Sequence, residues 1–174
     1  VSVTIFYMRG ILFLDFDGVI NPYMYKQEVK PDRKKWLRIW KHPGFLHIPT
    51  YTIGQVNTNF DVDACRYVKN LCDRFDLKIV VTSSWKEFYS LKQIKALLSL
   101  RQLDSYVIDT TSKENQSRPH KIRAYIEAHH IQVYLVLDDI DMRADFPGHC
   151  IKTYNLFSKE QYQLAIQLLE VQHA

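Results

Sequence analysis

The sequence has no uninterrupted apolar run near the roughly 18 residues that a membrane-spanning helix needs. The first such stretch is broken by Arg9 and Gly10 and ends at Asp15. The N-terminal stretch also lacks the basic start and the small-residue cleavage site of a secretory signal, and the chain shows no internal repeat and no low-complexity tract. We therefore expect a soluble protein with no membrane partner. Its 174 residues, 47% of them apolar, match the usual size of one domain with its own core.

Cysteine is scarce and follows no ligand pattern. The chain holds three cysteines, Cys65, Cys72 and Cys150, an odd number without the spacing of a metal site. Small buried thiols in a reducing compartment explain such a set. We therefore expect reduced core cysteines in a cytoplasmic protein.

Negative charge is scarce in one segment. Residues 26–41 hold seven Lys or Arg against Glu28 and Asp32, so this segment carries +5, and the rest of the chain sums to −1. A positive island on a nearly neutral body favours an anionic partner, although many charge runs are plain solvated surface.

Five short apolar runs rich in β-branched residues predict strands that are buried on both faces. They are residues 10–16, 78–83, 105–110, 133–139 and 150–154. Segments of helical period lie between them, at residues 61–75, 85–100 and 119–130 and from residue 158 onward. This alternation predicts an α/β fold with a doubly wound, parallel, five-stranded Rossmann-like sheet.

Polar residues mark where these helices begin. Asn59 or Asp61 can cap the first of them, and Ser84 can cap the second. Ser158 followed by Gln161 three positions later has the pattern of a capping box.

A forty-residue insertion at residues 21–60 interrupts the alternation after the first strand. Connections in α/β units usually take two to six residues, and longer ones are commonly functional or disordered. The insertion is rich in aromatics, which favours order. We expect a small cap, with a short helix at "DRKKWLRIW" and a hairpin or extended flap at "FLHIPTYTIGQV".

Three of the predicted strands end in polar clusters. The clusters are Asp15 and Asp17, then Thr82, Ser83 and Ser84, then Asp138, Asp139 and Asp141. Taken singly, each could be an exposed strand end with a helix cap. Ligands of open α/β sheets bind outside the carboxyl ends of the strands, and if the first and fourth strands are neighbours, four carboxylates converge there. So many like charges need bound protons or a cation, and Mg²⁺ is the hard ion that suits carboxylate and phosphate oxygens.

With "LFLDFDGVINP", "VVTSSW" and "LVLDD" in this order, the chain resembles the haloacid dehalogenase-like (HAD) superfamily of hydrolases that form an aspartyl phosphate. Within it, the motifs look most like the HAD domains of Swiss Army Knife RNA repair proteins. The resemblance covers most of the chain, with the insertion as its variable cap. It implies a Mg²⁺-dependent phosphatase.

The resemblance also implies roles for the first two motifs. Asp15 would be the nucleophile, and Asp17 would be the general acid and base, with its backbone carbonyl on the metal. Thr82, Ser83 and Gly18 would bind the phosphoryl group, aided by the N-terminus of the following helix.

The remaining roles fall on the second half of the chain. Asp138 and Asp139 would complete the metal site, with their division of labour left open. Arg118 and Lys121 both qualify as the cation that stabilises the phosphoryl group, and Arg118, beside Pro119 at the helix entrance, is the preferred one.

The substrate prediction depends on the insertion, since the chain has no room for a large lid elsewhere. Interleaved aromatic and basic residues suit stacking on bases and contact with phosphates. The candidate contacts are Lys34, Lys35, Trp36, Arg38 and Trp40. Alternatively, these residues form a cap helix that docks its Trp side chains on the core. The RNA repair resemblance implies removal of a terminal phosphate from RNA or DNA; a small-molecule phosphatase or nucleotidase and a silent nucleic-acid-binding module are the rival interpretations.

Overall fold

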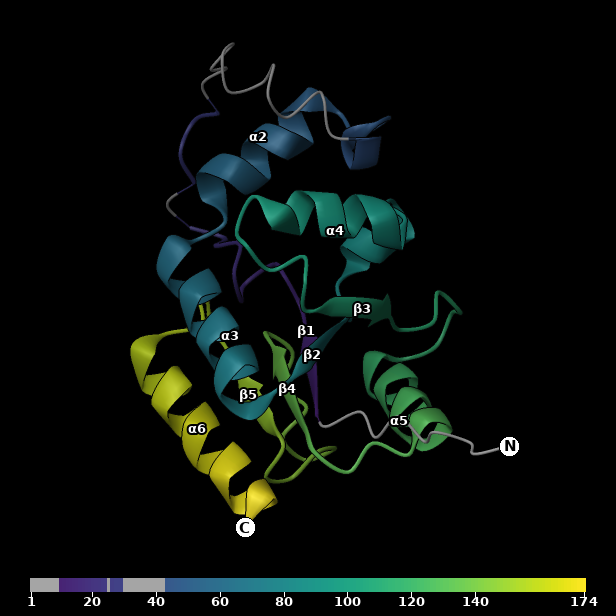
Figure 1. Ribbon diagram of the computed structural model, residues 1–174, viewed down its shortest axis with the longest axis vertical. Helices are drawn as coiled ribbons and strands as arrows, with labels where there is room; N and C mark the ends of the chain where they lie inside the picture. The colour runs from purple at the N-terminus through teal and green to yellow at the C-terminus, as the bar shows by residue number, and fades with distance from the viewer. Residues whose placement is uncertain (1–9, 25, 30–42) are drawn as a thin grey trace, which may run out of the picture.

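The computed structural model describes residues 10–24, 26–29 and 43–174. Its five strands are β1 (Ile11–Leu14), β2 (Lys78–Val81), β3 (Val107–Thr110), β4 (Tyr134–Asp138) and β5 (Cys150–Lys152). They form one sheet in the order β3-β2-β1-β4-β5, and each neighbouring pair is parallel. This confirms the predicted doubly wound α/β fold, with β1 at the centre and strand order reversing beside it (Figure 1).

Helices cover both faces of the sheet. They are α2 (Thr50–Asn59), α3 (Val62–Phe75), α4 (Leu91–Ser99), α5 (Arg118–His129) and α6 (Lys159–His173), with two short 3-10 helices, η1 (Pro43–Phe45) and η2 (Ser84–Glu87). The helix α3 packs against α6 on one side of the sheet, and α5 lies on the opposite side (Figure 1). Because side chains alternate along a strand, Leu12 and Leu14 join the core under α3 and α6, whereas Ile11 and Phe13 join the core under α5.

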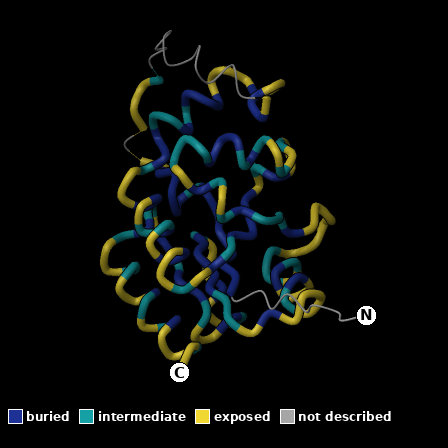
Figure 2. Tube along the Cα trace, in the orientation of Figure 1, coloured by how far each residue is buried: buried dark blue, intermediate teal, exposed yellow. Residues whose placement is uncertain are grey.

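The central strand is the most enclosed part of the molecule. All four residues of β1 are fully buried, and Figure 2 shows buried chain running through the centre while the outer turns of the helices are exposed. Cys65, Cys72 and Cys150 are buried and unpaired, as expected of core thiols. No helix in the described residues combines the length and the apolar character needed to cross a bilayer.

Two predicted helix starts are confirmed and one is wrong. The Asp61 side chain caps α3, and Ser158 forms the capping box of α6. Ser84, however, does not begin a long helix: it opens η2, and α4 begins only at Leu91, where Ser90 forms a complete capping box. The stronger reciprocal cap at Ser90 determines where the α-helix starts.

The hairpin or extended flap predicted for "FLHIPTYTIGQV" is also wrong, because these residues contain the end of η1 and most of α2. Ile53, Val56 and Phe60 follow helical spacing and enter the core that α3 and α6 share. The helix α2 lies over α4 (Figure 1). Arg101 donates hydrogen bonds to the carbonyls of Asn57 and Phe60 at 2.8 Å, so the C-terminal end of α2 is satisfied by a side chain. The helix predicted at "DRKKWLRIW" lies outside the described residues.

Candidate active site

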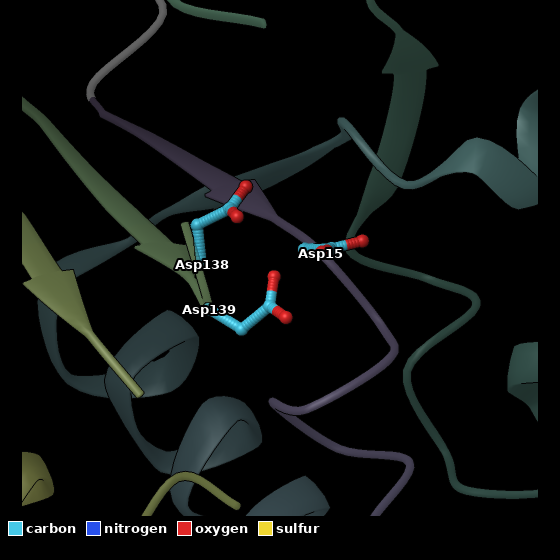
Figure 3. Close-up of side chains that lie close together, drawn as sticks. All are labelled: Asp15, Asp138 and Asp139. Atoms are coloured by element: carbon cyan, nitrogen blue, oxygen red, sulfur yellow. The ribbon is translucent and has the colours of Figure 1, made fainter. Parts of the chain in front are cut away.

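The acidic residues meet where β1 and β4 end side by side. Asp15 directly follows β1, Asp138 is the last residue of β4, and Leu14 pairs with Leu137 in the register between the two strands. One oxygen from each of Asp15, Asp138 and Asp139 lies within 4.8 Å of the others, and Figure 3 shows these three side chains at the two strand ends. Asp15 and Asp138 are buried. The strand adjacency therefore gathers three of the four predicted carboxylates.

Arg118 joins two of these carboxylates. It is the first residue of α5, and its Nη1 donates to Asp15 Oδ2 at 2.7 Å and to both oxygens of Asp138 at 2.8 Å. Lys121 lies one turn further along the helix, where its Nζ is 4.0 Å from Glu87 Oε1. Of the two cations that the sequence left open, the structure brings Arg118 to the acidic cluster.

The electrostatics of this cluster suit a divalent cation. Burial raises the pKa of Asp15, although Arg118 opposes the shift. Burial, followed by the negative charge of Asp15, raises the pKa of Asp138 to about 7. When ionised, the three carboxylates and one guanidinium leave two uncompensated negative charges. The ligand atoms are all oxygens, which is the donor set that Mg²⁺ prefers. The residues present therefore fit that ion.

Asp139 contacts the turn that follows β1. Tyr23 donates its hydroxyl to Asp139 Oδ2 at 2.6 Å. Gly18 has a φ of 76°, and a Cβ there would lie 2.9 Å from the Cβ of Asp139 and 2.7 Å from the ring of Tyr23. Glycine is thus required for this close approach. Its N–H donates to the carbonyl of Asn21, so its phosphate-binding role stays a prediction.

The carboxylate of Asp17 is not part of the three-membered cluster. Its Oδ2 accepts a hydrogen bond from Trp85 Nε1 at 3.0 Å, and its Oδ1 accepts one from Asn21 Nδ2. Trp85 belongs to η2 and packs edge-on against Phe16 and Phe60. Two donors therefore fix the orientation of the Asp17 side chain, while metal binding through its backbone carbonyl stays a prediction.

The residues after β2 form the third side of the site. Thr82 and Ser83 are fully buried, and Ser83 caps η2. In the described part of the chain, Thr82 Oγ1 has no hydrogen-bond partner although it is buried. Burying a hydroxyl without a hydrogen-bond partner costs free energy unless a ligand supplies the partner. A phosphoryl oxygen can accept this hydrogen bond.

Sequence reasoning missed several contacts in this region. The two side chains that donate hydrogen bonds to Asp17 belong to the motifs: Asn21 is the last residue of "DFDGVIN", and Trp85 is the last residue of "VVTSSW". Their side-chain N–H groups could have identified them as partners of an acid. The buried Lys86 comes directly after that Trp. By contrast, the five basic and aromatic substrate candidates of the insertion, Lys34, Lys35, Trp36, Arg38 and Trp40, lie outside the described residues.

The chain matches a known protein family. A family model described as "HAD domain in Swiss Army Knife RNA repair proteins" matches residues 11–157. The matched region starts with β1 and extends past β5, so it contains all five strands and every residue of the site described above. Neither the curated proteins nor the solved structures gave a match.

Proposed function

Because the chain belongs to the family of HAD domains in Swiss Army Knife RNA repair proteins and is a HAD-type hydrolase domain, we propose that it is a Mg²⁺-dependent phosphatase that removes terminal phosphates from nucleic acid. The observation that carries the proposal is the cluster of Asp15, Asp138 and Asp139, whose oxygens approach within 4.8 Å of one another. Arg118 donates to two of these side chains. This arrangement supports a buried nucleophile beside a site for a divalent cation.

In the proposed reaction, a carboxylate oxygen of Asp15 attacks the phosphorus of the terminal phosphate. The bond between phosphorus and the leaving oxygen breaks, and Asp17 gives its proton to that oxygen. Water then attacks the phosphorus of the phosphoaspartate and passes a proton to Asp17. The bond between phosphorus and the Asp15 oxygen breaks, inorganic phosphate leaves, and both carboxyl groups return to their starting states.

The other residues of the site neutralise charge and fix geometry. Asp15, Asp138, Asp139 and the backbone carbonyl of Asp17 would hold Mg²⁺, which supplies positive charge to the phosphoryl oxygens when it is bound. Arg118 orients Asp15 through the 2.7 Å contact. The hydroxyl of buried Thr82 has no hydrogen-bond partner among the described residues, so it is available to a phosphoryl oxygen. Residues of the chain and the bound cation would then act together on the charge that phosphoryl transfer spreads over these oxygens.

Trp85 is proposed as a positioning residue for Asp17. A general acid must lie within hydrogen-bond reach of the atom that it protonates. The indole N–H holds one carboxylate oxygen of Asp17 at 3.0 Å, and the ring is itself wedged against Phe16 and Phe60. The aromatic cluster therefore limits where the proton of Asp17 can be delivered.

The test is hydrolysis of p-nitrophenyl phosphate and of end-phosphorylated oligonucleotides, with Mg²⁺ and with EDTA. We expect activity only with Mg²⁺, and we expect Asp15→Asn to abolish it while the circular dichroism spectrum stays unchanged. Asp63→Asn, which alters an exposed acid paired with Arg66 on α3, is the matched control and should behave as the unsubstituted protein. Mg²⁺-dependent turnover by the Asp15→Asn variant would show that the nucleophile is misassigned.

The substrate class needs its own comparison. Free nucleotides and end-phosphorylated oligonucleotides of the same base should be assayed side by side. We expect the oligonucleotides to have the higher kcat/KM, with a steep loss of affinity as salt rises. A preference for free nucleotides by orders of magnitude would instead identify a small-molecule phosphatase.

A further inference from the structure

Among the residues that the structure describes, the buried cation Lys86 finds only weak charge compensation. It lies in η2, and only 3% of its surface is exposed. Its Nζ donates to the carbonyl of Thr82 at 3.3 Å and lies 3.5 Å from Glu87 Oε1, a half-exposed carboxylate. Burial, followed by the positive charges of Lys121 and Arg118, lowers the pKa of Lys86. Burying an ammonium group is costly unless it is paired and fully hydrogen-bonded, and an ammonium has three donors to satisfy.

Two further cations lie in the first turn of α5 beside it. Arg118 begins this helix and Lys121 follows three residues later, and the first turn contains no acidic residue. Cations at a helix N-terminus oppose the helix dipole, so this placement destabilises α5. Lys121 Nζ also approaches Glu87 Oε1, at 4.0 Å. One partly exposed carboxylate therefore stands between two lysines, at distances longer than those of close ion pairs.

These side chains surround a pocket that adjoins the proposed reaction centre. The pocket has a volume of about 220 Å³ and is lined by Thr82, Ser84, Lys86, Glu87, Gln116, Arg118 and Lys121. It has room for a phosphate group with several waters, since a water occupies about 30 Å³. Thr82, whose buried hydroxyl lacks a partner in the described residues, is in its wall. Arg118 is in the wall too and contacts Asp15, so the pocket continues from the acidic cluster.

We propose that Lys86, Lys121 and Gln116 form a second anion subsite, which binds a phosphate of the substrate next to the one that is removed. Glu87 occupies this place in the free protein and gives way to the incoming anion. The inference rests on the proposed function and narrows its substrate class to phosphate monoesters that carry a second phosphate close by. Two sources share this chemistry: the adjoining phosphodiester of an oligonucleotide and the second phosphate of a nucleoside bisphosphate.

The test compares substrates that differ only in the second charge. One pair is an end-phosphorylated dinucleotide with a phosphodiester linkage and the same compound with a neutral methylphosphonate linkage. The other pair is a nucleoside bisphosphate and the corresponding monophosphate. We expect kcat/KM to be about tenfold or more higher for the charged member, as for other charge-assisted contacts. A gain confined to the dinucleotide pair identifies a nucleic-acid end as the ligand, and a gain in both pairs identifies any adjacent phosphate.

Variants of the pocket residues test whether the gain in kcat/KM comes from this pocket. In Lys121→Gln and in Lys86→Met, the ratio of kcat/KM between charged and neutral members should fall to within about threefold of one. Lys92→Gln, which changes an exposed lysine of α4, is the control and should keep the full ratio. Because Lys86 is buried and its variant can fail to fold, the Lys121 variant gives an independent result.

The inference and the proposed function fail in different ways. If the protein hydrolyses charged and neutral members equally well, or if the Lys121 variant keeps the full ratio, the subsite is refuted while the phosphatase stands. If no phosphate monoester is hydrolysed, the proposed function fails. The subsite can still be measured by calorimetry as the ratio of Kd values for the two dinucleotides in the Asp15→Asn variant, and equal Kd values there would refute it.

Discussion

The indole of Trp85 offers a sharp test of how the proposed general acid is held. Trp85→Phe removes the N–H that donates to Asp17 Oδ2 at 3.0 Å but keeps an aromatic ring against Phe16 and Phe60. Asp17 becomes a carboxylate as it gives up its proton, and a hydrogen bond to a charged group contributes about 1.5 to 3 kcal/mol. If this free energy serves to place the acid, its loss slows departure of a poor leaving group by roughly 10- to 100-fold. This is a partial loss, at or below the lower end of the about 10²- to 10⁴-fold that general acid catalysis supplies.

The assay compares leaving groups. An alkyl phosphate needs a proton donor when its oxygen departs, whereas p-nitrophenolate departs without one. In Trp85→Phe we expect kcat/KM to fall about 10- to 100-fold for the alkyl ester and less than about threefold for p-nitrophenyl phosphate. Since kcat/KM reports the steps up to departure of the leaving group, the later hydrolysis of the phosphoaspartate does not enter the comparison.

A merely structural role would give a different result. Phe157→Leu disturbs a buried aromatic pair with Tyr67 that does not include Trp85, and it should lower stability while leaving the ratio between the two substrates unchanged. An equal loss of kcat/KM for both esters in Trp85→Phe, or no loss for either, would refute the positioning role.

Three other outcomes follow from the geometry. Thr82→Val removes a buried hydroxyl that has no partner among the described residues. Urea denaturation should therefore show a free energy of unfolding that is unchanged or higher by up to about 1 kcal/mol, while kcat/KM falls about tenfold or more. A clear loss of stability would contradict this prediction. In Arg118→Met, the buried carboxylates lose their cation, and without Mg²⁺ the free energy of unfolding should drop by about 3 kcal/mol; a drop below about 1 kcal/mol would argue against the pairing. The pKa of Asp138 is raised to about 7, so the folded protein binds this proton more tightly than the unfolded chain. The resulting stabilisation is full below about pH 4 and is lost as the pH rises through about 7. Melting temperatures in EDTA should therefore fall from pH 5 to pH 8, Mg²⁺ should restore them, and Asp138→Asn should flatten the profile; a Tm that rises over this range in EDTA would contradict the raised pKa.

The sheet and its acidic edge were predictable because their signals are local. Strands buried on both faces are continuous apolar runs, and the residue after each run lies at a carboxyl end. Parallel topology then brings Asp15 and Asp138 together through one rule, that ligand sites form where strand order reverses. The fold and the family resemblance were both confirmed.

The helix α2 was missed because its composition favours a strand. Residues 50–59 contain three threonines and tyrosine, isoleucine and valine, which are common in sheets. What makes them helical lies far away in the sequence: α4 provides the surface on which they pack, and Arg101 satisfies the end of the helix. No window of the sequence contains both partners.

The orientation of the side chains in the site could not be predicted from the sequence either. The sequence placed Arg118 and Lys121 one turn apart on the same helix, and only the three-dimensional position of α5 decides which one meets Asp15. The contact between Asp17 and Trp85 joins residues 68 positions apart. Propensity and spacing carry no information about such contacts.

The site has two neighbouring regions of opposite charge, an acidic pole and a basic pole. Asp15, Asp138 and Asp139 form an acidic pole that suits a cation, and Lys86 and Lys121 form a basic pole that suits an anion. Arg118 contacts two residues of the acidic pole and lines the same pocket as the two lysines. Each pole is costly alone, because like charges share a poorly solvated volume. In the proposed function, a phosphorylated substrate and a divalent cation bound together would cancel both costs, because the cation would neutralise the carboxylates and the phosphates of the substrate would neutralise the lysines. Their binding should therefore be mutually reinforcing, and by linkage the factor by which Mg²⁺ tightens the anion must equal the factor by which the anion tightens Mg²⁺.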